Sequence, residues 1–209
     1  MTQSESMGME IEQALNQISE IHHHLIRTEC YRGYRSVTMA SSGVVALLGG
    51  VFQSGMALSE SGFVWLWVGL AALNLVIVSS EIAVEYWMRL TRLEQRLTCR
   101  TVGQFLPSLV AGALLTLAFW GCGDPVANVV FLPGMWSLIF SLGVFASRPY
   151  LPQGVGWVGL FYLAAGSVLL SLAHDGHNII PWAMPVTFGL GQMLLALVLY
   201  WNLERTVSP

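Results

Sequence analysis

Three polar side chains that recur along one long apolar stretch are the residues best placed to do chemistry. Asn74, Glu81 and Glu85 are spaced so that they share one face of a helix, and Arg89 continues that face one turn later. A charge near the middle of a membrane helix costs at least about 2.5 kcal/mol, so such groups usually face the protein interior or a wet cavity. The spacing therefore predicts either a cytoplasm-facing carboxylate that binds a cation or relays a proton, or a ladder of Glu–Arg ion pairs to the third span or the turn at Arg148.

A second group of polar residues has the donor atoms of a metal site. His174, Asp175 and His177 supply two imidazoles and a carboxylate, which are suitable ligands for a first-row metal ion. A closed site would require this loop to converge with the loop that carries Cys122 and Asp124. The alternative is an ordinary solvated loop, because the order of these residues matches no specific motif. The sequence predicts no cofactor, and a metal ion at these loops is a hypothesis.

The composition of the chain indicates a lipid bilayer as its solvent. The 209 residues are 55% hydrophobic and 10% charged, with a mean hydropathy of +0.62, whereas about a quarter of a soluble domain is charged. The net charge of -3 and the lack of a basic domain argue against nucleic acid as a partner. Backbone groups that face lipid must be satisfied within their own segment. We therefore predict an all-α fold, a polytopic membrane helix bundle.

Six stretches are long and apolar enough to approach the roughly 20 helical residues that cross a hydrocarbon core. The expected organisation is an amphipathic cytoplasmic helix with a juxtamembrane segment at 1–36, a six-helix transmembrane domain at 37–205 and a short cytoplasmic tail at 206–209. The predicted spans are 37–58, 63–84, 105–122, 126–147, 155–173 and 179–203.

The arginines set the predicted orientation. All nine fall in the segments that lie on one side of the predicted membrane, which the positive-inside rule assigns to the cytoplasm. Both termini are then cytoplasmic, and the protein is expected in the cell inner membrane. Residues 86–104 are predicted to continue the second helix along the membrane surface. The arginines are Arg27, Arg32, Arg35, Arg89, Arg92, Arg96, Arg100, Arg148 and Arg205.

The residues before the first span form an apolar seam with helical spacing. Ile11, Leu15, Ile18 and Leu25 recur at intervals typical of a packed or coiled helix. The seam predicts a contact surface for a second copy of the chain or for another protein. The alternative is that the helix lies along the cytoplasmic ends of the bundle or on the bilayer surface.

Aromatic, small and proline residues have predicted structural roles. Ser42, Ala46, Gly50 and Ser54 form a smooth strip along the first span, which permits close approach of another helix. Prolines are expected to bend the fourth and sixth spans. Tryptophan and tyrosine are expected to form belts at the two membrane surfaces. The outer belt would hold Trp65, Trp67, Trp120 and Trp182, and the inner belt Tyr86, Trp87, Tyr200 and Trp201.

The layout as a whole resembles a group of uncharacterised bacterial six-helix inner-membrane proteins. The resemblance rests on the acidic N-terminal helix, the arginine-rich segment after the second span, and three short stretches at 132–136, 147–150 and 199–205. It implies bacterial origin and six-span topology, and it brings no activity with it.

Three functional hypotheses follow. The first is a non-enzymatic membrane protein that acts through a protein partner or through self-association. The second is a small transporter or channel that uses the polar face of the second span. The third is a metal-binding protein or metalloenzyme at the outer loops. The sequence contains no nucleophile elbow, phosphate loop, paired-cysteine or zincin motif, so an enzyme is the least favoured class.

Overall fold

The computed structural model describes residues 36–56, 58–88, 92–121, 129–174 and 181–204. These residues are helical apart from short turns, and no strand occurs among them. The all-α prediction is therefore confirmed. The predicted amphipathic helix before the first span lies outside the described residues.

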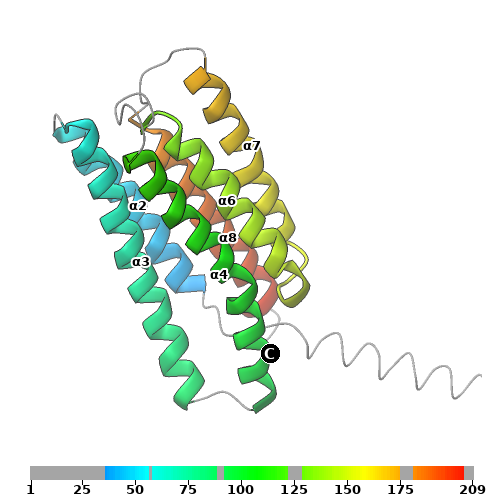
Figure 1. Ribbon diagram of the computed structural model, residues 1–209. Coiled ribbons are helices and arrows are strands. Elements are labelled where there is room, and N and C mark those ends of the chain that lie inside the picture. Colours follow the sequence, from blue (N-terminus) through cyan, green and yellow to red (C-terminus); the bar gives the residue numbers. More distant parts are fainter. Residues whose placement is uncertain (1–35, 57, 89–91, 122–128, 175–180, 205–209) are drawn as a thin grey trace, which may run out of the picture.

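The described residues form long helical rods that run side by side in one bundle (Figure 1). The last rod is continuous but changes its winding, because π-helical segments precede and follow its α-helical part. A short 3-10 helix, η1 (Arg148–Tyr150), follows α6. The rods are α2 (Ser36–Gly55), α3 (Glu60–Met88), α4 (Arg92–Gly121), α6 (Leu132–Ser147), α7 (Val155–His174) and the run of η2 (Pro185–Leu190), α8 (Gly191–Leu199) and η3 (Tyr200–Glu204).

Five of the rods are long and apolar enough to cross a membrane. They correspond to the predicted first, second, third, fifth and sixth spans. The exception is α6, whose 16 residues make a helix about 24 Å long at 1.5 Å per residue. Its length is below the roughly 20 residues that a span needs, so the predicted count of six spans is not established by helix length alone.

Neighbouring rods follow the order α3, α2, α8, α7, α6, α4. The four middle rods each have a packed neighbour on both sides, whereas α3 packs mainly on α2 and α4 mainly on α6. The two end rods are therefore the least covered parts of the bundle. In α4 the most apolar stretch contains no residue that is buried within the molecule.

Small residues bring the middle rods close together. A side chain at Gly43 would lie 3.0 Å from the backbone oxygen of Gly189, and one at Gly166 would lie 2.9 Å from that of Gly134. Pro185 fills the space in front of Gly50. The predicted strip along the first span is thus in close contact with the last rod, although its final member, Ser54, is exposed.

Two sequence-based expectations about helix ends were wrong. The second helix does not continue through residues 86–104, because α3 ends at Met88 and the arginine-rich residues from Arg92 onward begin α4. The side-chain Nε2 of Gln95 donates a hydrogen bond to the backbone oxygen of Tyr86 at 2.9 Å, which joins the two helix ends. The second wrong expectation is the bend in the fourth span. Pro133 occupies the first turn of α6 and starts that helix, where the missing N–H costs nothing.

Candidate functional site

The three predicted polar residues of the second span all lie on α3 and are all half-buried. The side-chain Nδ2 of Asn74 donates to the backbone oxygen of Leu70 at 3.1 Å. Its Oδ1 is buried and has no hydrogen-bond partner. A buried acceptor without a donor is uncommon in proteins, and an oxygen of this kind is suited to bind water or an ion.

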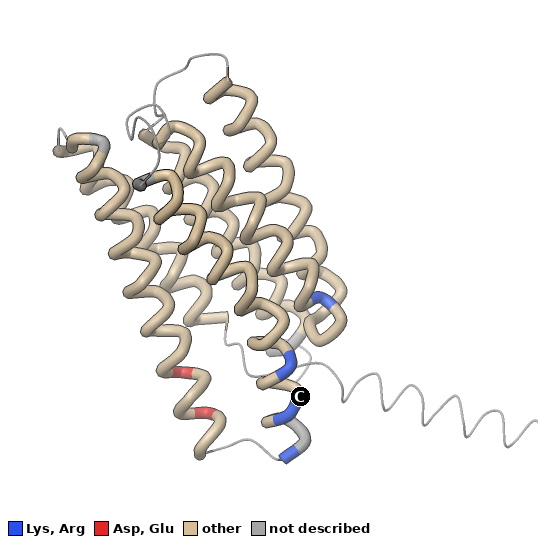
Figure 2. The backbone as a smooth tube through the Cα atoms, in the orientation of Figure 1, with Lys and Arg blue, Asp and Glu red and all other residues tan. Residues whose placement is uncertain are grey.

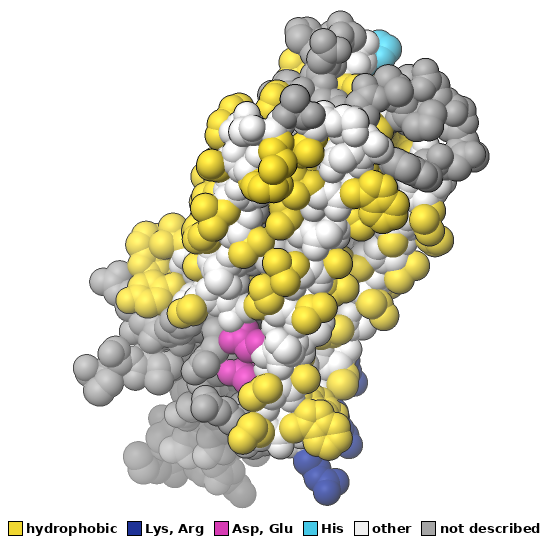
Figure 3. All heavy atoms as spheres, turned by 90° about the vertical axis from the view of Figure 1, so that its left-hand side faces the viewer, with side chains coloured by type: hydrophobic (Ala, Val, Ile, Leu, Met, Phe, Trp, Pro, Cys, Tyr) yellow, Lys and Arg dark blue, Asp and Glu magenta, His cyan; other side chains and the backbone are white. Residues whose placement is uncertain are grey.

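Glu81 lies two turns nearer the cytoplasmic end predicted from the arginines. Within the described ranges it forms no ion pair with the side chains of Arg92, Arg96, Arg100 or Arg148, all of which are exposed. Figure 2 places the acidic positions on the lower half of α3 and the arginines on other rods. In Figure 3 the two acidic side chains gather on one edge of α3, and the arginines lie at the opposite side. Glu81 therefore forms no part of a Glu–Arg ladder with these four arginines. Glu85 does have an interaction partner, and Arg89 lies outside the described residues.

Nearer the other end of α3, on the same face as Asn74, the side chain of Trp67 belongs to a hydrogen-bonded network with Gln53 and Pro181. Trp67 is 3% exposed and Gln53 is 8% exposed. The indole Nε1–H of Trp67 donates to Oε1 of Gln53 at 2.7 Å, and Nε2 of Gln53 donates to the backbone oxygen of Pro181 at 3.3 Å. Trp67 is thus a core residue, and its expected place in an aromatic belt was wrong.

Two further polar residues in the bundle were not predicted from the sequence. Gln192 on α8 has a buried Oε1 without a partner, and the same holds for the hydroxyl of Tyr162 on α7. Tyr162 is completely buried and packs against the rings of Phe140 and Phe188, with centroid distances of 4.7 and 5.5 Å. The sequence signal for each residue is weak, because each is one of several polar side chains in a mostly apolar span.

Glycine makes room for the tyrosine. A Cβ atom at Gly191 would overlap the phenol ring and hydroxyl of Tyr162. The hydroxyl therefore lies directly against the backbone of α8, one residue before Gln192. Three buried oxygen atoms therefore lack a hydrogen-bond partner, and they come from three different rods: those of Asn74, Tyr162 and Gln192.

The predicted metal and partner residues lie mostly outside the described part of the chain. His174 ends α7 and is exposed, whereas Asp175 and His177 fall among residues the structure does not describe. Among the residues that are described, no group of three or more His, Cys, Asp or Glu side chains could hold a metal ion. The seam residues Ile11, Leu15, Ile18 and Leu25 also fall outside the described ranges.

The apolar helices and their lipid-facing side chains fit the class of α-helical membrane proteins. Large apolar side chains are exposed along α3 and α4, as lipid contact requires; Leu73, Val76, Leu114 and Leu117 are 48 to 68% exposed. Comparison of the chain with protein-family models, with curated proteins and with solved structures finds no match.

Proposed function

We propose that this protein is a six-span inner-membrane protein with both termini in the cytoplasm, and that the polar face of α3 is a pathway for protons or a small cation. The observation that carries the proposal is the buried, unpaired Oδ1 of Asn74. An amide oxygen can accept a hydrogen bond from water or coordinate a cation, and none of the described residues around Asn74 donates a hydrogen bond to its Oδ1.

Glu81 extends this polar face toward the cytoplasm. It lies seven residues beyond Asn74, or about 10 Å along the helix at 1.5 Å per residue, and it has no ion pair with the described arginines. A carboxylate in that position attracts cations into the membrane and can exchange a proton with water. Asn74 and Glu81 would then be successive stations for an ion that enters from the cytoplasm.

The Trp67–Gln53–Pro181 network would form the outer gate of such a pathway. Its polar groups are paired with one another, and the apolar side chains of Phe63, Val64 and Leu132 pack around it. Transport across the whole membrane would require these contacts to part.

Ion flux into proteoliposomes tests the proposal. The purified protein should admit protons, Na⁺ or K⁺ when a gradient is imposed, and the Glu81→Gln variant should reduce the rate to that of empty vesicles. Ser80→Ala is the matched control, because Ser80 is exposed and bonds only its own helix at the backbone oxygen of Ile77. Absence of flux in the unaltered protein at every cation tested would remove this function.

The orientation is tested by chemical labelling. Cys99 is exposed on the arginine-rich end of α4, so a variant retaining only this cysteine should resist a membrane-impermeant maleimide in intact cells and react after permeabilisation. Labelling in intact cells would reverse the proposed topology. The resemblance to bacterial six-helix proteins supports the placement in an inner membrane.

Self-association or binding of a protein partner is the second candidate. One observation favours it: a side chain at Gly69 on α3 or at Gly112 on α4 would meet nothing within 4 Å. Outward-facing glycines let membrane helices approach closely. Cross-linking in native membranes should capture a dimer that Gly69→Leu disrupts, or one that Leu15→Asp with Ile18→Asp disrupts if the N-terminal seam is the contact.

A further inference from the structure

The outer face of α4 changes from basic to apolar at one point along its length. Arg92, Arg96 and Arg100 recur every four residues and are all exposed. The same side of the helix continues through Gly103 and Pro107, also exposed, and then through apolar side chains. The apolar continuation includes Val110 and Leu114, which are 49% and 60% exposed.

The opposite side of α4 is fixed against the protein. Leu97, Thr98 and Thr101 are 7%, 3% and 1% exposed, and the hydroxyl of Ser147 donates to the backbone oxygen of Thr101 at 3.4 Å. These contacts prevent the helix from turning its arginines inward. The basic stripe must therefore face the surroundings of the protein.

We propose that the outer face of α4 binds an anionic phospholipid, with its phosphate on Arg96 and Arg100 and its acyl chains along Gly103, Pro107 and Val110. The proposal rests on the order of basic and apolar side chains along the helix. The guanidinium groups of three successive turns can bind a phosphate at headgroup level, and the apolar side chains of the following turns can contact the acyl chains. A soluble acidic protein would match only the basic turns.

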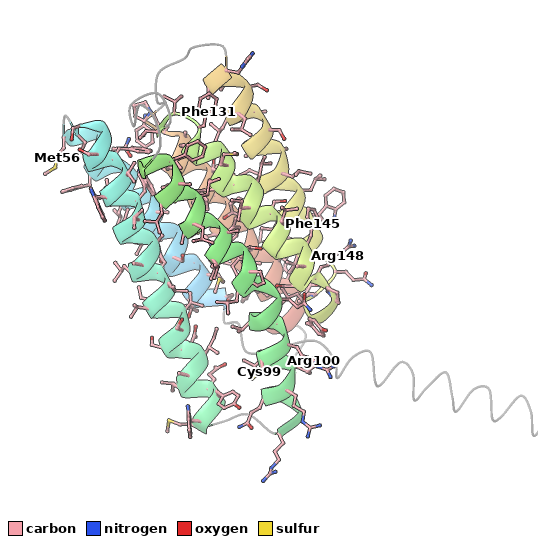
Figure 4. The ribbon with its side chains drawn as sticks, in the orientation of Figure 1. Met56, Cys99, Arg100, Phe131, Phe145 and Arg148 are labelled. Atoms are coloured by element: carbon pink, nitrogen blue, oxygen red, sulfur yellow. The ribbon has the colours of Figure 1, made fainter. Side chains whose placement is uncertain are left out.

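Two other features strengthen the choice of a lipid. A side chain at Gly103 would meet nothing within 4 Å, so no part of the described protein covers the backbone of α4 where the glycerol and upper acyl chain would lie. Figure 4 shows Arg100 and Arg148 toward the same end of the bundle. Arg148 is exposed, and its guanidinium lies against Gly156. It adds positive charge at this level without belonging to the stripe.

Lipid binding to the purified full-length protein provides the test. Native mass spectrometry of the detergent-solubilised protein should retain phosphatidylglycerol in preference to phosphatidylcholine with the same acyl chains. Arg96→Gln should weaken retention about fivefold, and replacing Arg92, Arg96 and Arg100 together by Gln about a hundredfold, since each basic residue near a membrane surface contributes independently. The matched Lys triple variant should keep most of the binding, because it keeps the charge.

The alternative outcomes each contradict the proposal in a different way. Equal retention of phosphatidylcholine would mean that only hydrocarbon is recognised. Equal thermal stabilisation by glycerol phosphate would mean that the site takes a free phosphate, and stronger stabilisation by polyglutamate would replace the lipid by an acidic protein surface. Unchanged phosphatidylglycerol retention in the Arg96→Gln variant would place the lipid elsewhere.

Discussion

Two glutamines in adjacent rods each have a buried side-chain oxygen, and the hydrogen-bonding states of these oxygens are opposite. Gln53 on α2 uses both ends of its amide, accepting from Trp67 and donating to Pro181. Gln192 on α8 leaves its buried Oε1 without a partner, as does Asn74 with its Oδ1. The difference distinguishes polar groups that stabilise the fold through hydrogen bonds between helices from polar groups that contribute no such bond.

Pro185 explains why the carbonyl of Pro181 needs a donor from another helix, which Gln53 provides. Pro185 has no backbone N–H, so the carbonyl oxygen of Pro181, one helical turn earlier, loses its usual donor. The amide of Gln53 supplies that donor from the neighbouring helix, and its oxygen satisfies the indole N–H of Trp67. The side-chain oxygens of Asn74 and Gln192 have no such donor.

The largest effect is expected where the paired network is broken. Gln53→Leu leaves the buried Trp67 N–H without an acceptor and removes the donor from the part-buried carbonyl of Pro181, and an unsatisfied buried group costs about 1–3 kcal/mol. We expect the free energy of unfolding, measured by denaturant titration in mixed micelles, to fall by about 3 kcal/mol. Gln192→Leu is the matched substitution. If it lowered the free energy of unfolding more than Gln53→Leu does, the distinction between the two glutamines would be wrong.

Close packing beside Gln192 gives the next largest effect. Gly191→Ala places a methyl group into the ring and hydroxyl of Tyr162, and overpacking a core typically costs about 1–3 kcal/mol. The control is Gly69→Ala, where the added methyl meets nothing within 4 Å and the better helix propensity of alanine is worth up to about 1 kcal/mol. Thermal unfolding should therefore shift in opposite directions in the two variants.

Removing an unpaired oxygen should change stability little. Asn74→Leu and Gln192→Leu each replace a buried amide oxygen that has no partner, so we expect stability to stay the same or to rise by up to about 1 kcal/mol. The Asn74→Leu variant should also lower ion flux in proteoliposomes, because Asn74 lies in the proposed pathway. A loss of stability as large as that of Gln53→Leu would assign these amides to the structural group.

The smallest change in stability is expected for the carboxylate. Glu81→Gln keeps the size and hydrogen-bonding ability of the side chain while it deletes the charge, and Glu81 has no ion pair with a described arginine to lose. The free energy of unfolding should change by less than about 0.5 kcal/mol, while flux is lost. Destabilisation of about 1 kcal/mol or more would show that the carboxylate is paired and structural.

The sequence was sufficient for the long apolar helices because hydropathy over 20 residues is a strong signal. The break between α3 and α4 was missed because residues 88–92 contain no glycine or proline, and the charged face of 92–104 fits either helix. Trp67 was misplaced because tryptophan near a helix end usually lies at the interface. Only the packed structure reveals that Gln53 supplies an acceptor for it inside the core.

The candidate site was predicted in part. Helical spacing alone was enough to put Asn74, Glu81 and Glu85 on one face of α3, because that relation is local. The unpaired state of Asn74 and the burial of Gln192 and Tyr162 depend on which neighbouring rods supply donors, and sequence spacing within one helix carries no information on that.

The short rod α6 has a consequence for the membrane around the protein. Its 16 residues extend about 24 Å, whereas the 30 residues of α4 beside it extend about 45 Å. A hydrocarbon core of about 30 Å is thicker than the first, whereas the first turns of α4 carry Arg92, Arg96 and Arg100 and so belong at headgroup level. As a membrane-crossing helix, α6 is expected to thin the bilayer on its side of the bundle, so the protein is expected to distinguish among bilayers by acyl-chain length.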